Sequence, residues 1–147
     1  IQIDFDKPDK DNRDWIFRTD EVFVYDALLM TLENAVKFSP ASSRVVVSLT
    51  ASRKGRRSFT IEVTDQGPGI PEHEQEKIFT MFFRGSRTRN TTKGLGFGCA
   101  IVKLYTEALK GRVHVRNEPA GGCTFTLFFP ESDEEGEKAR AEGDNSK

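Results

Sequence analysis

The chain has 147 residues, of which 36% are hydrophobic and 31% are charged, and its formal net charge at neutral pH is −1. This length suits one domain with its own hydrophobic core, and the composition is that of a folded protein. No apolar run approaches the roughly 20 residues of a membrane-spanning helix, and no signal peptide opens the chain. We therefore expect a cytoplasmic domain that makes no membrane contact.

Charge is unevenly distributed along the chain. Residues 131–147 hold seven acidic and three basic side chains and almost no apolar ones, which predicts a disordered acidic tail after a domain of residues 1–130. The body keeps a small excess of basic side chains, which suits an anionic ligand but does not indicate nucleic-acid binding. Cys99 and Cys123 lack the spacing of a metal site, so we expect buried free thiols in a reducing compartment.

The first third of the chain contains strand and helix patterns. Residues 1–5 predict a strand by their alternation, and residues 15–17 predict a second short strand. Thr19 or Asp20 can cap the long helix that follows, because either side-chain oxygen can accept a free amide of the first turn. We expect that helix to end near Phe38, before a Ser-Pro pair.

The middle of the chain is richer in β-structure. Residues 44–51 and 58–64 predict a hairpin, and the basic turn between them is expected to be a solvated tip. A tight glycine-proline loop covers residues 65–71, and residues 72–79 predict a short helix with acidic residues in its first turn. Residues 82–93 are basic and lack periodicity, which predicts a long mobile loop.

The last elements complete the fold prediction. Residues 97–109 predict a helix that ends at a Lys-Gly stop signal, and residues 112–116 and 123–129 predict two further strands. Strands and helices occur in clusters, which favours an α+β architecture: a two-layer sandwich with helices on one face of a mixed, mostly antiparallel sheet. Such layers can hold a ligand between helices and sheet.

The first candidate group of functional residues lies near the end of the long predicted helix. Asn34, Lys37 and Phe38 have the spacing i, i+3, i+4 and share one helix face. The amide can orient a metal ion or a phosphate, the ammonium can meet phosphate charge, and the ring can cover a base. The alternative is an exposed helix end with ordinary polar residues.

The second group follows the predicted strand 58–64. Asp65 ends that strand, and Gly67 and Gly69 let the backbone approach a flat ligand closely. A carboxylate accepts hydrogen bonds, so Asp65 can bind the exocyclic amino group of adenine but would reject the O6 of guanine. A turn in which the carboxylate only bonds its own backbone is the alternative.

The third group is a glycine-rich stretch before the predicted helix 97–109. Gly94, Gly96 and Gly98 alternate there, which exposes backbone N–H groups beside a helix N-terminus and favours phosphate. The dinucleotide-binding fingerprint would need a glycine where Cys99 stands, and no Gly-Lys-Ser/Thr of a Walker loop follows. The loop before the stretch is basic and carries Arg84, Arg87, Arg89 and Lys93.

In their chain order, these groups and the phenylalanine-rich segment 78–84 resemble the N, G1, F and G2 boxes of bacterial sensor histidine kinases. They resemble the catalytic ATP-binding domain of those kinases, in the superfamily that includes DNA gyrase B, Hsp90 and MutL. The resemblance covers residues 19–130. It implies a Bergerat-type α/β sandwich that binds Mg-ATP beneath a flexible lid at about residues 82–97.

The resemblance also implies roles for single residues. Asn34 would ligate Mg²⁺, Lys37 would contact phosphate, and Arg84 would be a lid arginine near the phosphates, which makes these three the catalytic set. Asp65 would accept from the adenine amino group, and Thr124 would support Asp65 through water. The implied nucleotide-binding set is Asn34, Lys37, Phe38, Asp65, Gly67, Gly69, Ile70, Phe82, Lys93, Gly94, Leu95, Gly96, Phe97, Gly98 and Thr124.

One departure from the family pattern is Met30, one turn before Asn34. Many of these kinases have a second asparagine there, and the gyrase, Hsp90 and MutL branch has a glutamate that activates water. A thioether is a poor Mg²⁺ ligand and cannot act as a general base. Glu33 is expected to point about a quarter turn away from the Asn34 face. We therefore expect no self-sufficient ATPase, and Mg²⁺ held by Asn34, phosphates and water.

The activity that the resemblance implies is transfer of the γ-phosphate of ATP to a histidine in two-component signalling. His73 and His114 are expected to be structural. The acceptor is then expected on a separate dimerisation segment of the same parent protein, a homodimer that could be membrane-anchored, with a response regulator as the next partner. A non-catalytic ATP-binding regulatory module and an anti-sigma-type serine kinase of the same fold remain alternatives.

Overall fold

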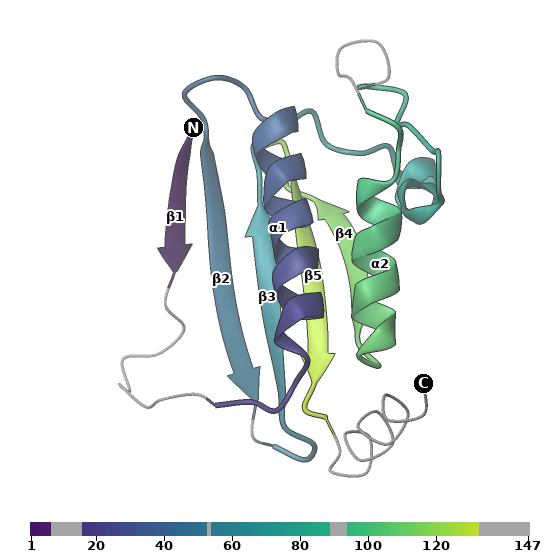
Figure 1. The fold of residues 1–147 in the computed structure, drawn as a ribbon. Helices are drawn as coiled ribbons and strands as arrows, with labels where there is room; N and C mark the ends of the chain where they lie inside the picture. Colours follow the sequence, from purple (N-terminus) through teal and green to yellow (C-terminus); the bar gives the residue numbers. More distant parts are fainter. Residues whose placement is uncertain (7–15, 53, 89–93, 133–147) are drawn as a thin grey trace.

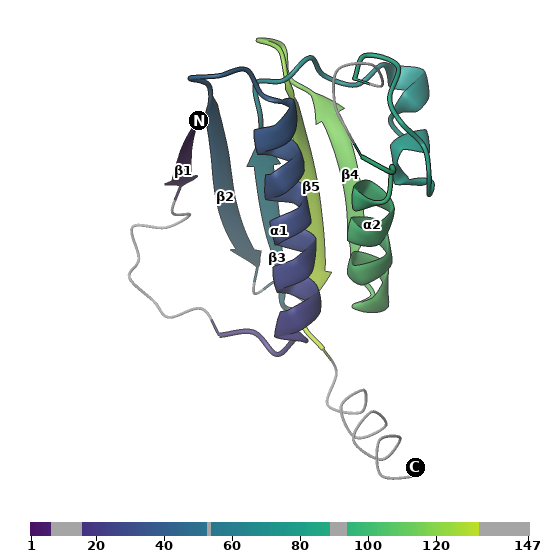
Figure 2. The same cartoon turned by 45° about the horizontal axis from the view of Figure 1, so that its top comes forward.

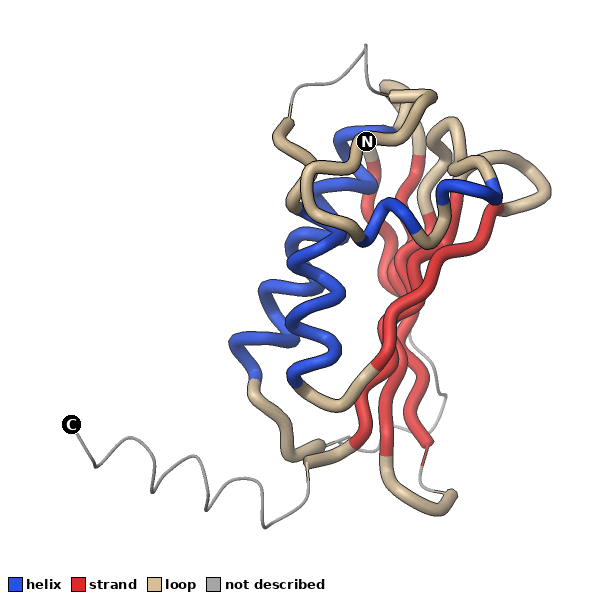
Figure 3. The backbone as a smooth tube through the Cα atoms, turned by 90° about the vertical axis from the view of Figure 1, so that its right-hand side faces the viewer, coloured by secondary structure: helices blue, strands red, loops and turns tan. Residues whose placement is uncertain are grey.

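The computed structural model describes residues 1–6, 16–52, 54–88 and 94–132. Within these residues a five-stranded sheet forms one layer, and the helices α1 and α2 cover one of its faces (Figure 1, Figure 3). The elements in chain order are β1 (Gln2–Asp6), α1 (Glu21–Phe38), β2 (Arg44–Ser52), β3 (Ser58–Thr64), the 3-10 turns η1 (Glu72–Glu74) and η2 (Lys77–Phe79), α2 (Gly98–Ala108), β4 (Arg112–Asn117) and β5 (Cys123–Pro130). The predicted α+β sandwich is confirmed. No helix of the described ranges is long and apolar enough to cross a membrane.

The sheet is mixed and mostly antiparallel, as predicted. Its strand order is β1-β2-β3-β5-β4, and β1–β2 is the one parallel pair among the described strands. Because side chains alternate across a strand, one face of the two central strands supplies the core. On β3 and β5 that face presents Ile61, Val63, Phe125, Leu127 and Phe129, all buried.

Helix α1 begins where an acidic side chain caps it. Asp20 Oδ1 accepts hydrogen bonds from the backbone N–H groups of Val22, at 3.1 Å, and Phe23, at 3.5 Å. The residues that face the sheet are small (Ala27, Thr31 and Ala35 are buried), so the helix axis can lie close to the strands. Helix α2 lies beside α1 on the same face of the sheet (Figure 2).

The short strand predicted after the polar turn is wrong. Ile16 and Phe17 belong to no strand, and Trp15 lies outside the described residues. Side chains rather than a backbone ladder hold this segment: the Phe17 ring packs against Phe59 at 5.0 Å, and Arg57 Nη2 donates to the Ile16 carbonyl at 2.6 Å. The hairpin tip is exposed at Lys54, Gly55 and Arg56, as expected, and half-buried Arg57 next to it forms a 3.1 Å ion pair with Glu131.

The segment predicted as a helix over residues 72–79 is two 3-10 turns, η1 and η2. Each turn buries one side chain, Glu74 in η1 and Ile78 in η2, and this inward packing replaces a regular helix.

The last strand, β5, ends at Pro130, and the Glu131 N–H still donates to the Arg57 carbonyl at 2.8 Å. Residues 133–147 of the expected acidic tail lie outside the described residues.

The cap of α1 supports a stability prediction. Asp20→Ala should lower the free energy of unfolding by about 1 kcal/mol, because two N–H groups of the first turn lose their acceptor. Thr19→Ala is the matched control: the Thr19 hydroxyl has no hydrogen-bond partner among the described residues. Chemical denaturation measures both. A larger loss for Thr19→Ala would assign the cap to Thr19.

Candidate functional site

A cavity of about 380 Å³ lies where the C-terminal end of α1, the loop after β3 and the glycine-rich stretch before α2 meet. Its wall contains members of all three groups that the sequence singled out. The predicted residues that line it are Asn34, Lys37, Phe38, Asp65, Gly69, Ile70, Arg84, Gly94, Leu95, Gly96, Phe97 and Gly98. Residues as far apart in the chain as Asn34 and Gly98 thus line one cavity.

The glycine-rich stretch lies directly against the polar end of α1. A Cβ atom on Gly98 would stand 3.2 Å from Asn34 Nδ2, and one on Gly94 would stand 2.8 Å from Lys37 Nζ. A side chain at position 98 would press on the Asn34 amide, whereas the Lys37 ammonium stands at the end of a flexible side chain and can move aside. The ammonium also lies 5.3 Å from the ring centroid of Phe38. Backbone N–H groups, an amide and an ammonium are therefore concentrated around one part of the cavity.

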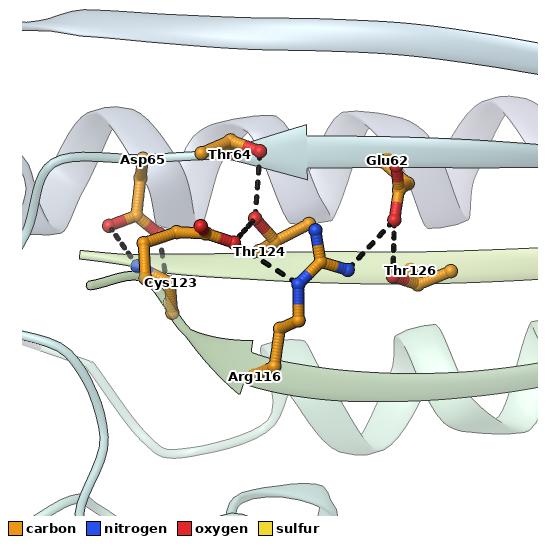
Figure 4. Close-up of polar contacts among 8 residues, drawn as sticks. Glu62, Thr64, Asp65, Arg116, Cys123, Thr124 and Thr126 are labelled. Carbon is orange, nitrogen blue, oxygen red and sulfur yellow. Dashed lines mark hydrogen bonds and ion pairs between the residues drawn. The ribbon is translucent and has the colours of Figure 1, made fainter. Parts of the chain in front are cut away.

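Asp65 provides the carboxylate of the cavity and is only 5% exposed. Its Oδ1 accepts from the N–H of Gly67 at 2.7 Å and from the N–H of Cys123 at 3.4 Å. Its Oδ2 lies 3.0 Å from Cys123 Sγ, which donates (Figure 4). Asp65 therefore bonds its own turn and also lines the cavity, so the turn contact is not its only position-dependent feature.

The loop that follows Asp65 is fixed from two sides. The Asn117 side chain at the end of β4 accepts from the Ile70 N–H at 2.8 Å and donates to the Ile70 carbonyl at 2.7 Å. On the other side, Arg87 Nη1 donates to the Pro68 carbonyl. Gly69 has a φ of +69°, and a Cβ there would stand 3.0 Å from Asn117 Oδ1. The sequence did not reveal Asn117, because it is 47 residues from Ile70 along the chain.

A buried acid that the sequence also missed holds the start of the basic loop. Glu74 is 6% exposed, lines the cavity and accepts from the N–H of Ser86 at 3.0 Å. Arg84 and Arg87 of the same loop line the cavity as well. The described part of the loop is therefore attached over the cavity and brings cations to it. Lys93 and Arg89 lie outside the described residues.

Three predicted site residues do not line the cavity. Gly67 lies between two residues that line the cavity, since a Cβ there would stand 3.0 Å from both Asp65 Oδ1 and the Phe38 carbonyl. Phe82 is 71% exposed, and its ring lies 4.7 Å from that of Phe97. Thr124 points to the opposite face of the sheet, and the side chain that contacts Asp65 in its place is Cys123.

A polar network on that opposite face fixes the strand ends (Figure 4). The Thr124 hydroxyl lies 2.8 Å from that of Thr64 and donates to Glu118, which also pairs with Arg116 at 3.2 Å. Arg116 in turn donates to Glu62 at 2.9 Å, and this hydrogen bond holds the pKa of Glu62 below its usual value. The network links β3, β5 and β4 next to Asp65 and stabilises their register.

Both cysteines are free thiols that line the cavity, Cys123 buried and Cys99 half-buried. Burial raises the pKa of Cys99 to about 11. Burial and the neighbouring charge of Asp65 raise the pKa of Cys123. Both thiols therefore stay protonated at neutral pH and are weak nucleophiles.

The expectation that Glu33 points away from the site is wrong, because Glu33 lines the cavity. It stands one turn before Lys37 on the helix (i, i+4), and the cavity extends along that side of α1. Met30 is packed against the core, and neither Met30 nor either histidine is part of the cavity wall.

Fold and site together define an α+β sandwich with a ligand cavity at the end of its first helix, closed by a glycine-rich stretch. Residues 19–133 match the family model of histidine kinase-, DNA gyrase B- and HSP90-like ATPases, and the chain belongs to this family.

The chain is 38% identical over 128 residues to the sensor-like histidine kinase SenX3 of Mycobacterium tuberculosis, covering 82% of this chain and 30% of SenX3. It is 36% identical to the adaptive-response sensory kinase SasA of Synechococcus sp. (strain CC9311), covering 70% of this chain and 26% of SasA.

Solved structures agree with this membership. The mycobacterial sensor histidine kinase MprB superposes with a TM-score of 0.72 at 29% identity, over 88% of this chain and 81% of the MprB chain. Full-length ShkA in complex with AMPPNP superposes with a TM-score of 0.71 at 26% identity, over 89% of this chain and 26% of ShkA. The chain thus spans about 30% of the length of SenX3 and about a quarter of the length of SasA.

The turn before β5 provides a stability prediction for the site. Gly121 and Gly122 both have positive φ, but a Cβ on Gly122 would stand 2.0 Å from the Asp65 carbonyl, whereas one on Gly121 meets nothing within 4 Å. Gly121→Ala should cost about 1 kcal/mol from backbone strain alone. Gly122→Ala should cost about 3 kcal/mol or more, because the β3–β5 junction must open. Equal losses in chemical denaturation would contradict this close approach.

Proposed function

We propose that this domain binds Mg-ATP and donates the γ-phosphate to a histidine outside this chain, in two-component signal transduction. The observation that carries the proposal is the cavity itself. It combines a buried carboxylate, Asp65, with an amide, an ammonium and a glycine backbone from Asn34, Lys37 and the stretch 94–98. The named kinase activities of SenX3 and SasA support it, since both relatives contain a region similar to this chain.

The two kinds of lining suit the two ends of the nucleotide. Asp65 would accept from the adenine amino group, with Phe38 and Ile70 as apolar neighbours of the base. Lys37 and the N–H groups before α2 would contact the phosphates, because a helix N-terminus and a cation both favour negative charge. Arg84 would add a charge from the loop above. Phosphoryl transfer needs mainly such positioning and charge neutralisation.

The residues at the end of α1 fit a Mg²⁺ ion that is bound largely through ATP. No three His, Cys, Asp or Glu side chains of the described ranges come together as a metal site. Mg²⁺ commonly keeps several waters and takes one or two protein oxygens plus substrate phosphates. Asn34 would supply its amide oxygen, with the phosphates and water completing the shell. The ion would neutralise charge on the transferred phosphoryl group.

The acceptor would belong to another segment. The His73 side chain is 75% exposed and His114 lies on exposed β4, and neither lines the cavity. We propose that the acceptor histidine lies on a dimerisation segment of a homodimeric, cytoplasmic or membrane-anchored parent, and that a response regulator receives the phosphate. The relatives, of which this chain matches about a third or less, have ample length for such a segment.

Replacement of the carboxylate tests the binding part. Asp65→Asn should weaken binding of Mg-ATP at least about tenfold, because a charged hydrogen bond to the amino group is lost. Asp4→Asn is the matched control: it makes the same chemical change on the edge strand β1, outside the cavity, and should leave the Kd unchanged. Isothermal titration calorimetry measures both. An unaltered Kd for Asp65→Asn would remove the adenine assignment.

Transfer is tested with ATP labelled at the γ-phosphate and the dimerisation segment of a related sensor kinase. We expect label on that segment that is lost in acid and kept in base, as phosphohistidine requires. Acid-stable label would indicate a serine kinase. Binding of ATP without any transfer would indicate the regulatory module.

A second candidate function follows from the position of Glu33. A carboxylate in the cavity wall next to Asn34 could act as the general base of an ATPase, a role that Met30 cannot fill. Phosphate release by the domain alone, absent in Glu33→Gln, would support this candidate. If the domain alone releases no phosphate, this candidate is wrong and donation of the γ-phosphate to a histidine remains the proposed function.

A further inference from the structure

Helix α1 has a row of apolar side chains that face solvent. The members of this row are between 39% and 65% exposed, and they are Val22, Tyr25, Leu29 and Val36. At about 100° of rotation per residue, the four positions fall within about 60° of one another on the helix, so they form one continuous stripe. The stripe is turned away from α2, because α1 meets α2 on another side, where the Phe23 ring stacks on Tyr105 at 5.1 Å.

The part of the sheet beside α1 is also apolar and exposed. Phe5 is the register partner of Val47 on β2, and Val47 is buried in the core on the helix side of the sheet, so Phe5 points to that side as well. Ile3 and Leu49 share this direction, since each lies two residues from one member of this pair. All three remain exposed, and Phe5 most at 69%, because the helices cover the strands farther from β1 (Figure 1, Figure 2).

The stripe and the bare strands lie on the same side of the molecule and form an outer apolar surface. This surface consists of Ile3, Phe5, Val22, Tyr25, Leu29, Val36 and Leu49. Single exposed apolar side chains are common on soluble proteins, whereas a group of them indicates an interaction site. None of the seven side chains belongs to the cavity wall, so nucleotide binding does not account for their exposure.

Acidic side chains border the stripe on α1. Asp26 stands four residues after Val22 and three before Leu29, and such spacings place side chains next to each other on a helix. Glu33 has the same spacing from Leu29 and Val36. Within the residues that the structure describes, neither Asp26 nor Glu33 forms an ion pair. The border of the stripe therefore carries negative charge, which favours a partner with basic groups.

We propose that the outer apolar surface binds an amphipathic helix of a protein partner, whose apolar stripe is flanked by lysine or arginine side chains. The partner helix packs beside α1 and buries its apolar stripe against Tyr25 and Leu29 of α1 and Phe5 of β1. Its basic side chains pair with Asp26 and Glu33 along the border. The spacing supports a helix as the bound element, because apolar side chains three, four and seven residues apart on one helix match those of another.

The same charges disfavour other occupants of this surface. A second copy of this chain would bring the acidic border of its own α1 against Asp26 and Glu33, and like charges across an interface weaken binding. An anionic membrane surface would meet the same repulsion. A basic amphipathic helix is the occupant that suits both the apolar stripe and its acidic border.

The test uses an 18-residue peptide, equal in length to α1, with leucine on one helical face and lysine on the other. Fluorescence anisotropy of the labelled peptide measures its Kd for the whole chain without nucleotide. Leu29→Glu should weaken binding at least about tenfold, because it places a charge in the middle of the stripe. Leu104→Glu is the matched control: it makes the same change at an exposed leucine of α2, outside the surface, and should keep the Kd within about twofold.

A second peptide, with glutamate in place of lysine, tests the acidic border. It should bind at least about tenfold more weakly than the lysine peptide, and Asp26→Lys should reduce this difference at least about threefold. Thermal unfolding checks that each variant is folded, and Tyr25→Glu, at the most exposed position of the stripe, replaces Leu29→Glu if that variant is not.

Three results would overturn the proposal: no binding of the lysine peptide, equal losses in Leu29→Glu and Leu104→Glu, or equal binding of the two peptides. Because no nucleotide is present, none of these results depends on the proposed function.

Discussion

The close approach of two backbones at the ends of β3 and β5 is the constraint on which the site depends. Gly122 allows the turn before β5 to pass against the Asp65 carbonyl, and the Asp65 N–H then pairs with the Cys123 carbonyl. A side chain at position 122 would separate the strands. This pairing places a carboxylate at the edge of the hydrophobic core, where few waters compete for its hydrogen bonds.

The side chains at the ends of β3 and β5 differ between the two faces of the sheet. The face toward the helices carries Asp65 and Cys123, which line the cavity. The opposite face carries Thr64 and Thr124, whose hydroxyl groups bond each other. Because side chains alternate in direction along a strand, neighbouring residues either line the cavity or stabilise the sheet register, but not both. The register fixed by this network holds the Asp65 carboxylate in the cavity wall from the opposite face of the sheet.

Helix α1 likewise packs on the sheet with one set of residues and lines the cavity with another. Its small residues Ala27, Thr31 and Ala35 lie on the sheet, while Asn34 and Lys37 extend into the cavity beside the glycine-rich stretch. The position of the helix therefore sets the distance between these polar side chains and the backbone N–H groups of the glycine-rich stretch. The cations of the loop above reach the same cavity, because the loop is anchored at its start rather than free along its whole length.

The sequence by itself determined the order and type of the main elements, the two-layer architecture and about half of the cavity residues. Hydrophobic periodicity, the α1 cap and the glycines are local signals, and they hold regardless of the remaining fold. The resemblance to the kinase boxes added the roles of Asn34, Lys37 and Asp65, which remain proposals. Local signals were not sufficient for residues 16–17 and 72–79, where side-chain packing replaced the predicted strand and helix.

Only the tertiary structure decided which neighbours complete the site. A spacing along the chain cannot show that Asn117 bonds Ile70, that Glu74 holds Ser86, or that Cys123 rather than Thr124 faces the carboxylate. Each of these contacts is set by strand register or loop path, and a shift of one residue reverses which face a side chain occupies. The sequence supplied the chemical groups, and the pairing of β3 with β5 determined which of them meet.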